Sequence, residues 1–279
     1  AHLGYGGTVK GDCIACPYHG WEWDVDGANT CIPYQDKPSH ARLRRWDVVE
    51  RHGLVFVWHD PNGGGPRAGW GLPDLFTDFD EVPGDEAGYH DCYPHAVVDK
   101  PSEPVHPQLI QENAADSMHF RYTHGSPGEP QVLGFDPQGP LWHSSIGFAS
   151  PRSGEIALRV FNLNCGVGIS YAVFDGRRDH YRLILTATPV DEERSHLRVS
   201  YFLRRLSESP DAMTVEQKEF VERTDELFEQ DARIWRHQVF VQKPVFARQD
   251  VAAYTALRGW CEQFYEQPER PTPTPVVVE

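Results

Sequence analysis

The sequence predicts an α+β protein in two parts: a small all-β module over residues 1–60, and an antiparallel sheet with covering helices over residues 61–279. A chain of 279 residues lies in the range where one large domain or two smaller ones are ordinary. The first part combines Gly-rich loops with short apolar runs. The second part contains β-rich stretches separated by turn clusters and flanked by segments that favour helix.

The N-terminal module is predicted from its turns and strand patterns. The aromatic pair Trp21 and Trp23 precedes residues 24–27 (Asp-Val-Asp-Gly), which are typical of a hairpin turn. The apolar run over residues 53–58 predicts a strand. Residues 60–66 then interrupt both helix and strand. We therefore place the boundary between the two parts near Pro61.

The second part follows a different pattern. Turn clusters at residues 175–177 and 191–193 separate apolar stretches, which indicates antiparallel strands. Helices are expected to cover one face of the resulting sheet. The predicted elements are a helix over residues 108–124, β stretches over 158–174, 180–190 and 196–206, and a helix over 214–238.

Charge and composition exclude several classes of function. A formal net charge of -15, with no basic stripe of interleaved aromatic residues, argues against a nucleic-acid partner. No run approaches the roughly 18–20 apolar residues that span a bilayer, and the start lacks a signal-peptide pattern. The six cysteines are too sparse for a disulfide framework, so reduced thiols or metal ligands are expected. We expect a cytoplasmic protein.

The first metal-ligand pattern is Cys16-Pro-Tyr-His19-Gly-Trp21. Cys-x-x-His in a turn offers one thiolate and one imidazole, the mixture found in 2Fe-2S centres where imidazoles replace two thiolates. Cys13 and Cys16 also form a Cys-x-x-Cys pair, which could serve a zinc knuckle or a redox dithiol. The Gly-Trp that follows His19 favours the iron-sulfur interpretation.

The second pattern lies in the predicted helix over residues 108–124. Asp116 and His119 are three residues apart and share a helix face, whereas His119 and His124 would sit about 140° apart on a regular helix. A π-bulge or a helix end between the histidines would bring them together. Two imidazoles with open positions favour a non-haem ferrous site. The alternative for Asp116 is a carboxylate that only stabilises the helix or supports a ligand.

Such a site needs an anionic third ligand, and Asp231 is the candidate. It lies at helical spacing from Phe228 and Trp235, which puts it on the apolar face of the predicted helix over residues 214–238. A carboxylate there must be paired or bound to metal, because desolvating a lone charge is costly. The alternative is that Asp231 pairs with Arg233 or Arg236.

These motifs carry a family resemblance. The chain resembles the α subunit of Rieske non-haem iron oxygenases, whose catalytic domain has a START-like, helix-grip fold. Within that family it looks closest to the 3-ketosteroid 9α-hydroxylase oxygenase and cholesterol 7-desaturase group. The resemblance rests on residues 11–21, 112–119 and 229–237 for the family, and on residues 8–12, 58–60 and 258–265 for the group.

In that family the cluster also needs a Cys-x-His upstream of Cys16. His2 cannot supply it, because no cysteine precedes it by two positions, and we read His2 as a loop residue. The missing pair is expected before Ala1, so the chain looks N-terminally incomplete. Cys16 and His19 would then supply two of the four ligands of the 2Fe-2S cluster.

The resemblance further implies that His119, His124 and Asp231 ligate a mononuclear Fe(II). Asp116 would connect an iron-ligand histidine to a cluster histidine of a neighbouring subunit, typically in a homotrimer. An NAD(P)H-dependent reductase or a ferredoxin would supply electrons. The implied reaction uses O2 to hydroxylate or desaturate a small hydrophobic substrate, a sterol or steroid.

Two other functions stay open from the sequence. One is a Rieske-type electron carrier without oxygenase activity, which the set of Asp116, His119, His124 and Asp231 argues against because a carrier needs no second metal. The other is a START-like lipid-binding protein whose β module is stabilised by structural zinc.

Overall fold

The computed structural model describes residues 1–60, 63–66, 69–177 and 180–265. Backbone contacts divide the chain into two compact units, Ala1–Trp70 and Gly71–Glu279. The predicted boundary near Pro61 lies outside the described residues and stays a prediction. Within the described residues no helix has the length and apolarity to cross a membrane.

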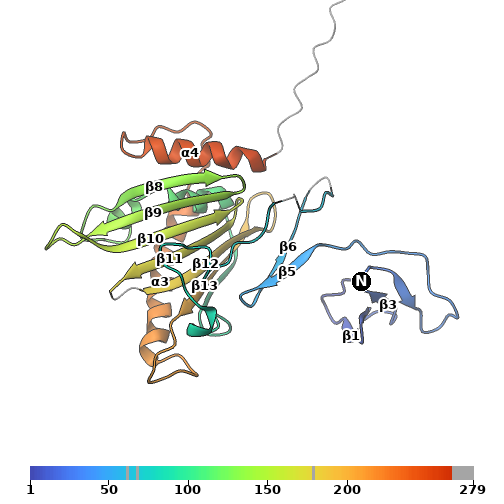
Figure 1. Cartoon of the computed structure of the whole chain (residues 1–279). Coiled ribbons are helices and arrows are strands. Elements are labelled where there is room, and N and C mark those ends of the chain that lie inside the picture. The colour runs from blue at the N-terminus through green and yellow to red at the C-terminus, as the bar shows by residue number, and fades with distance from the viewer. Residues whose placement is uncertain (61–62, 67–68, 178–179, 266–279) are drawn as a thin grey trace, which may run out of the picture. The chain divides into compact units, whose positions relative to one another are not determined.

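The first unit is a small β structure, as predicted. Four strands form an antiparallel sheet in sequence order, and two more form a separate hairpin (Figure 1). The predicted turn over residues 24–27 is confirmed, because the Asp24 carboxylate accepts hydrogen bonds from the backbone N–H groups of Asp26 and Ala28 at 3.0 and 2.8 Å. The strands are β1 Thr8–Lys10, β2 Cys13–Ala15, β3 Glu22–Asp24 and β4 Asn29–Cys31, with β5 Val48–Arg51 and β6 Leu54–Val57 in the hairpin.

The second unit is built on a seven-stranded antiparallel sheet in the order β7-β13-β12-β11-β10-β9-β8 (Figure 1). The strands from β8 to β13 follow one another along the chain as a meander, and β7 pairs with the last of them. The bounds are β7 Val97–Glu103, β8 Gln131–Gln138, β9 Leu141–Ala149, β10 Ile156–Cys165, β11 Ile169–Gly176, β12 His180–Pro189 and β13 Ser195–Leu203.

The sheet corrects part of the sequence prediction. The single β stretch predicted over residues 158–174 is two strands, β10 and β11, because the chain turns at Gly166 and Gly168, which both have positive φ. The stretches over 180–190 and 196–206 are confirmed as β12 and β13. Strands β7, β8 and β9 were not predicted.

Helices cover one face of the sheet. Register pairs run from Trp142 of β9 through Asn164, Ser170 and Leu185 to Val199 of β13, so these side chains share a face. The helix α3 packs near Val199, and α4 packs on Trp142. The helical elements are η1 Glu86–Gly88, α1 Pro107–Gln111, η2 Glu112–Ala114, α2 His119–Tyr122, α3 Val215–Trp235, α4 Val251–Cys261 and η3 Glu262–Phe264.

The helix α3 begins with a capping box. The Thr214 hydroxyl accepts a hydrogen bond from the backbone N–H of Gln217, whose side chain accepts one from the backbone N–H of Thr214. Phe228, Ala232 and other residues at helical spacing then bury one stripe of α3 against the sheet. The predicted helix over residues 214–238 is thereby confirmed, with its end at Trp235.

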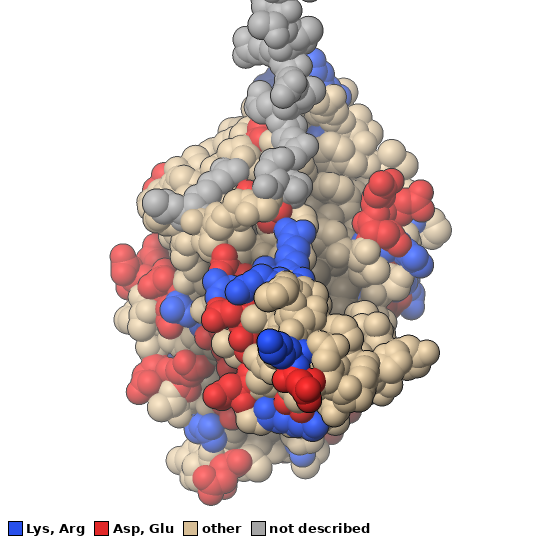
Figure 2. Space-filling model, turned by 90° about the vertical axis from the view of Figure 1, so that its right-hand side faces the viewer, with Lys and Arg blue, Asp and Glu red and all other residues tan. Residues whose placement is uncertain are grey.

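Acidic and basic side chains are interspersed over the face shown in Figure 2. The pattern differs from the continuous basic stripe of a nucleic-acid-binding surface. It accompanies the strongly negative net charge of -15.

The sheet face opposite the helices is closed by the segment before β7, which Arg182 of β12 holds in place. Its guanidinium is 1 % exposed and donates to the carbonyl of Leu75 at 2.6 Å, to the carbonyl of Val82 and to the Tyr89 hydroxyl. The Phe76 ring lies beneath the same guanidinium. A buried cation is tolerated here because several acceptors surround it.

We expect Arg182→Leu to lower the free energy of unfolding by about 3 kcal/mol, because it removes a buried donor that serves the carbonyls of Leu75 and Val82. Denaturant unfolding of the purified chain measures the change. Arg198→Leu, on the neighbouring strand β13, is the matched control because its side chain is 42 % exposed, and we expect a change within about 0.5 kcal/mol. Equal effects of the two substitutions would contradict this role for Arg182.

Candidate metal centre

The segment that carries the two histidines is a broken helix. The continuous helix predicted over residues 108–124 is wrong, because residues 115–118 leave the helical path between η2 and α2. The Asp116 carboxylate accepts hydrogen bonds from the backbone N–H groups of Met118 and His119 at 2.9 and 3.1 Å, and thereby caps α2. The helix ends at Tyr122, so His124 lies beyond it. A helix end between the two histidines was one of the two predicted solutions.

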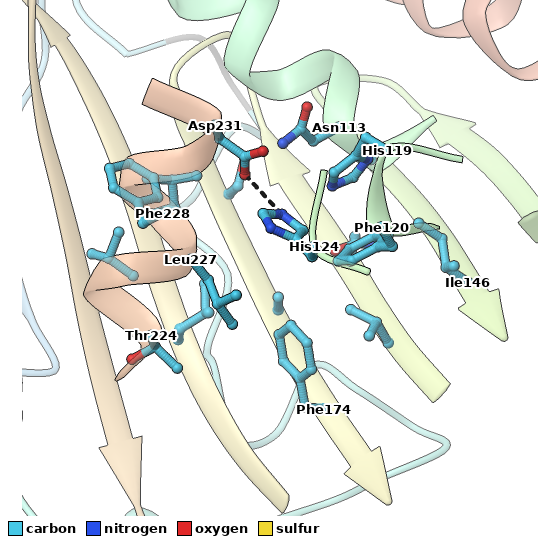
Figure 3. A pocket seen from close by; sticks show the side chains of 18 of the residues that line it. Asn113, His119, Phe120, His124, Ile146, Phe174, Thr224, Leu227, Phe228 and Asp231 are labelled. Carbon is cyan, nitrogen blue, oxygen red and sulfur yellow. Dashed lines mark ion pairs between the residues drawn. The ribbon is translucent and has the colours of Figure 1, made fainter. Parts of the chain in front are cut away.

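This break brings His119 and His124 together with Asp231 of α3. One ligand atom of each residue lies within 4.8 Å of the others, and the imidazole Nε2 of His124 is 3.2 Å from a carboxylate oxygen of Asp231. Figure 3 shows the three side chains pointing toward one another. Each is only 12–13 % exposed. Two imidazoles and one carboxylate therefore meet at a single point.

The alternative partners of Asp231 are engaged elsewhere. Arg236 contacts Glu103 and Glu229, and Arg233 lies 3.7 Å from Glu229 with its side chain 74 % exposed. The prediction that Asp231 lies on the inward face of its helix is confirmed. Its negative charge faces His124 rather than an arginine.

The ring orientations leave the Nε2 atoms of both histidines available to a metal ion. The Nδ1 of His119 lies 2.8 Å from the backbone carbonyl of Asp116, and the Nδ1 of His124 lies 3.1 Å from the side-chain oxygen of Gln230. Both oxygens are acceptors, so each Nδ1 carries the proton. Such bonds to the far nitrogen fix the tautomer of metal-binding histidines.

The pKa of His124 reflects the negative charge of Asp231 beside it. Burial alone would lower this pKa, but the hydrogen bond and negative charge of Asp231 raise it on balance. A raised pKa means that the pair favours a positive charge at this point. A divalent metal ion supplies that charge once the proton has left.

Asp116 contacts His119 mainly through its backbone. Its carboxylate oxygen is 3.8 Å from the Nδ1 of His119, farther than the carbonyl oxygen of the same residue. Burial would raise the pKa of Asp116, but its interactions with His119, and to a smaller extent with the Tyr254 hydroxyl of α4, lower this pKa on balance. The aspartate therefore joins the ligand segment to α4.

A buried ion pair strengthens the same connection. The guanidinium of Arg258 in α4 meets the Glu112 carboxylate at 2.8 and 3.0 Å, and Glu112 is 5 % exposed. The Tyr265 hydroxyl donates to the Gln108 side chain at 2.7 Å. The path of the chain from α1 to the histidines is thus held by the C-terminal part of the described chain.

A cluster of charged side chains fixes the C-terminal part of α3, close to Asp231. Arg236 pairs with Glu103 of β7 at 2.6 Å and with Glu229 at 2.6 Å, and Lys100 of β7 lies 3.1 Å from Glu229. The hydrogen bond from Arg236 is the largest cause that lowers the pKa of Glu229, and Lys100 adds to it. Together they outweigh the effect of burial and lower this pKa to about 2. These pairs tie the end of α3 to an edge of the sheet.

The three converging side chains open onto a cavity between the helices and the sheet. The cavity has a volume of about 390 Å³ and is lined mainly by aliphatic and aromatic side chains. In Figure 3, His119 and Asp231 lie at one end of the view, and Phe174 and Thr224 lie at the other. The size and lining suit a small hydrophobic molecule.

Cys16 and His19 lie in the first unit, in the tight turn between β2 and β3. The backbone N–H of Cys16 donates to the carbonyl of Trp21, and that of Gly20 donates to the carbonyl of Cys16, at 2.8 and 2.9 Å. Gly20 has φ +72°, and a Cβ there would lie 3.1 Å from the Pro33 ring. The backbone N–H of Tyr18 is the main cause that lowers the pKa of Cys16, with a smaller effect from that of His19. A turn that favours thiolate suits a metal ligand.

Sequence reasoning missed three side chains around the site. Gln230 orients His124, Tyr254 helps to lower the pKa of Asp116, and Asn113 lines the cavity beside His119. Gln230 is adjacent to Asp231, and Asn113 lies in the segment that leads to the histidines. Only Tyr254 carried no local signal, because its contact depends on the packing of α4.

Comparison with known proteins places these features in context. Residues 57–265 match the family described as the 3-ketosteroid 9alpha-hydroxylase C-terminal domain, and residues 1–50 match the Rieske [2Fe-2S] domain family. The chain is 27% identical to a 3-ketosteroid-9-alpha-monooxygenase oxygenase component of Rhodococcus rhodochrous, with 96% of this chain and 71% of that protein covered. It is 30% identical to the corresponding protein of Mycobacterium tuberculosis, with 93% and 68% covered.

Two further similarities are more limited. A cholesterol 7-desaturase of Hemicentrotus pulcherrimus is 36% identical over 131 residues, which cover 45% of this chain and 25% of that protein. Among solved structures, NdmA of Pseudomonas putida with caffeine aligns with a TM-score of 0.63 at 20% identity, covering 92% of this chain and 73% of that one. The structural likeness shows the shared fold.

The charged group at the end of α3 predicts a pH-dependent effect of Arg236→Met. The lowered pKa of Glu229 means that its pairing stabilises the fold fully above its ordinary value of 4.5 and is lost as the pH falls toward about 2. At pH 7 we expect the substitution to lower the free energy of unfolding by about 2 kcal/mol.

The measurement is the difference in unfolding between the original chain and Arg236→Met at several pH values. The difference should be largest above pH 5 and should narrow as the pH falls below 4. Arg233→Met is the control, because Arg233 is exposed and should give a small, flat difference. A difference for Arg236→Met that does not change with pH would contradict the assignment.

Proposed function

Because this chain belongs to the Rieske oxygenase α subunits of the 3-ketosteroid 9α-hydroxylase type, we propose that it uses O2 to hydroxylate or desaturate a hydrophobic, steroid-like substrate. The observation that carries the proposal is the meeting of His119, His124 and Asp231 at an apolar cavity of about 390 Å³. A metal with open positions beside an apolar chamber is the arrangement that oxidation of an unactivated C–H bond requires.

The donor set fits a mononuclear ferrous ion. Two imidazoles and one carboxylate on one side of a metal leave its other positions open, as in non-haem iron oxygenases. In the proposal His119, His124 and Asp231 hold this ion, while Cys16 and His19 hold part of a 2Fe-2S cluster. When bound, the two centres supply dioxygen activation and the electrons it consumes.

The protein's own side chains orient the two histidines and enclose the cavity. Gln230 and the carbonyl of Asp116 keep each Nδ1 protonated, so that the Nε2 atoms of His119 and His124 would be the atoms that bind a metal ion. Phe120, which packs edge-on against Phe148 at 5.0 Å, closes one side of the cavity next to the histidines. An apolar enclosure excludes water from the reacting C–H bond.

Asp116 is proposed as the connection for electrons arriving at the iron site. Its backbone carbonyl accepts a hydrogen bond from the His119 ring, and its carboxylate accepts from the backbone N–H groups of Met118 and His119. We propose that the protein forms a homotrimer, in which the cluster of a neighbouring subunit serves this site, and that an NAD(P)H-dependent reductase or a ferredoxin is the electron donor. The relatives' description as oxygenase components supports a separate donor.

Two alternatives predict different metal contents. An electron carrier would hold the iron-sulfur cluster alone, which gives no role to the converging set of two histidines and one aspartate. A lipid-binding protein would hold zinc alone, and the cavity by itself is compatible with it. The resemblance of the chain to oxygenase components along 96% of its length favours the enzyme.

Metal analysis of the protein purified with its iron tests the site. Asp231→Ala should remove the mononuclear iron, which is the iron found in addition to that of the 2Fe-2S cluster, because two imidazoles alone bind a ferrous ion weakly. Glu226→Ala, a substitution at an exposed position of the same helix, is the control and should retain that iron. Zinc in place of iron, or equal iron in both variants, would contradict the proposal.

Product analysis tests the reaction. The full-length protein with a reductase, NAD(P)H and a 3-ketosteroid should consume O2 and form a hydroxylated or desaturated steroid. His124→Ala should lower turnover by at least about 100-fold, since the loss of a ligand removes the metal that performs the chemistry. Iron-replete protein that consumes no O2 with any steroid would overturn the proposed substrate class.

A further inference from the structure

One buried amide in the cavity has no partner in the protein. Asn164 of β10 is 0 % exposed and lines the cavity, and neither its side-chain nitrogen nor its side-chain oxygen has a hydrogen-bond partner among the described residues. Buried polar atoms are nearly always paired. An amide that keeps both atoms free inside an apolar chamber therefore points to a ligand group that occupies its hydrogen bonds.

Asn164 differs from the neighbouring amides because it is fully buried with neither of its polar side-chain atoms paired. Gln111 also lines the cavity, but its side chain donates to the carbonyl of Gly166 and accepts from the N–H of Gly168, both at 2.8 Å. Asn162, one step along the same face of β10, donates to the Ser144 hydroxyl at 3.5 Å. Both polar atoms of Gln111 and the nitrogen of Asn162 therefore bond within the protein, whereas neither polar atom of Asn164 has a partner among the described residues.

The position of Asn164 makes one end of the cavity polar and leaves the other end apolar. It faces Ser170 across the β10-β11 pair, next to the turn that Gln111 holds. Four residues farther along β11, about 13 Å away, Phe174 stacks on Tyr181 with ring centroids 4.3 Å apart. The floor of the cavity is thus polar at the Asn164 end and aromatic at the Phe174 end.

We propose that Asn164 binds the ketone or hydroxyl oxygen at one end of an otherwise apolar substrate and so sets which carbon faces the metal-binding side chains. The amide nitrogen donates to a ketone, and the amide oxygen accepts from a hydroxyl. The apolar remainder lies toward Phe174 and Tyr181. The inference rests on the proposed function and adds the orientation in which the substrate binds.

The test compares three steroids with one skeleton, carrying a ring ketone, a hydroxyl at the same carbon, or neither. Their dissociation constants are measured by titration calorimetry on the full-length protein. Asn164→Leu, which keeps the shape and removes both polar atoms, should weaken binding of the two oxygenated steroids about tenfold, or about 1.4 kcal/mol. Binding of the steroid without oxygen should change less than about twofold.

Asn162→Leu is the matched control. It makes the same change on the same strand and face, at an amide whose nitrogen already bonds to Ser144, so it should shift all three affinities by one common factor. If Asn164→Leu also shifts all three equally, or shifts none, the proposal is overturned. The original protein must itself prefer the oxygenated steroids, and equal affinity for all three would overturn the proposal even if the variant did not fold.

Stability gives an independent readout. Since Asn164 makes no hydrogen bond to the described protein, Asn164→Leu should leave the unfolding midpoint without ligand equal or higher. A midpoint several degrees lower would show a structural role and would overturn the proposal. Oxygen-selective binding without any steroid product from the iron-replete protein with reductase would instead overturn the proposed function and leave the role of Asn164 standing.

Discussion

The structure depends on holding three donor atoms within 4.8 Å of one another although they come from segments more than 100 residues apart. Two largely enclosed imidazoles and a carboxylate do not stay together by hydrophobic packing, since each loses part of its hydration. Each segment is instead fixed by charged or hydrogen-bonded contacts to a neighbouring element. Arg236 fixes α3 to β7, and Arg258 fixes the histidine segment to α4.

The same helices that present the donor atoms also roof the cavity. The side chains of one sheet face form its floor, in rows that cross from β9 to β13. A shift of α3 relative to the sheet would therefore change both the distances at the metal site and the shape of the chamber. This coupling explains why the ion pairs of Arg236 lie so close to Asp231 along the helix.

Much of the site could be predicted because its signals are local. The position of Asp231 followed from helical periodicity with Phe228 and Trp235, and a helix end between His119 and His124 followed from their spacing of five. The effect of Tyr254 on Asp116 could not be predicted, because no local pattern says where α4 packs. The continuous helix over residues 108–124 failed where the Asp116 side chain competes for backbone N–H groups.

The fold was predicted least well at the edges of the sheet. Strands β7 and β8 lie at its two ends and contain Pro101 and Pro137, and a proline argues against a strand in any reading of sequence alone. An outermost strand tolerates proline because one side of it has no neighbour to bond. The merging of β10 and β11 into one stretch had a different cause, since Gly166 and Gly168 were not recognised as a turn.

Those two prolines also protect the edges of the sheet against pairing with another chain. A seven-stranded sheet with free edges is a template on which another chain could add a strand and begin an aggregate. Pro101 and Pro137 each remove an N–H from the outermost strands, so the ladder that an incoming strand would need is interrupted on both borders. The protein can keep a long open sheet under a ligand chamber without inviting polymerisation.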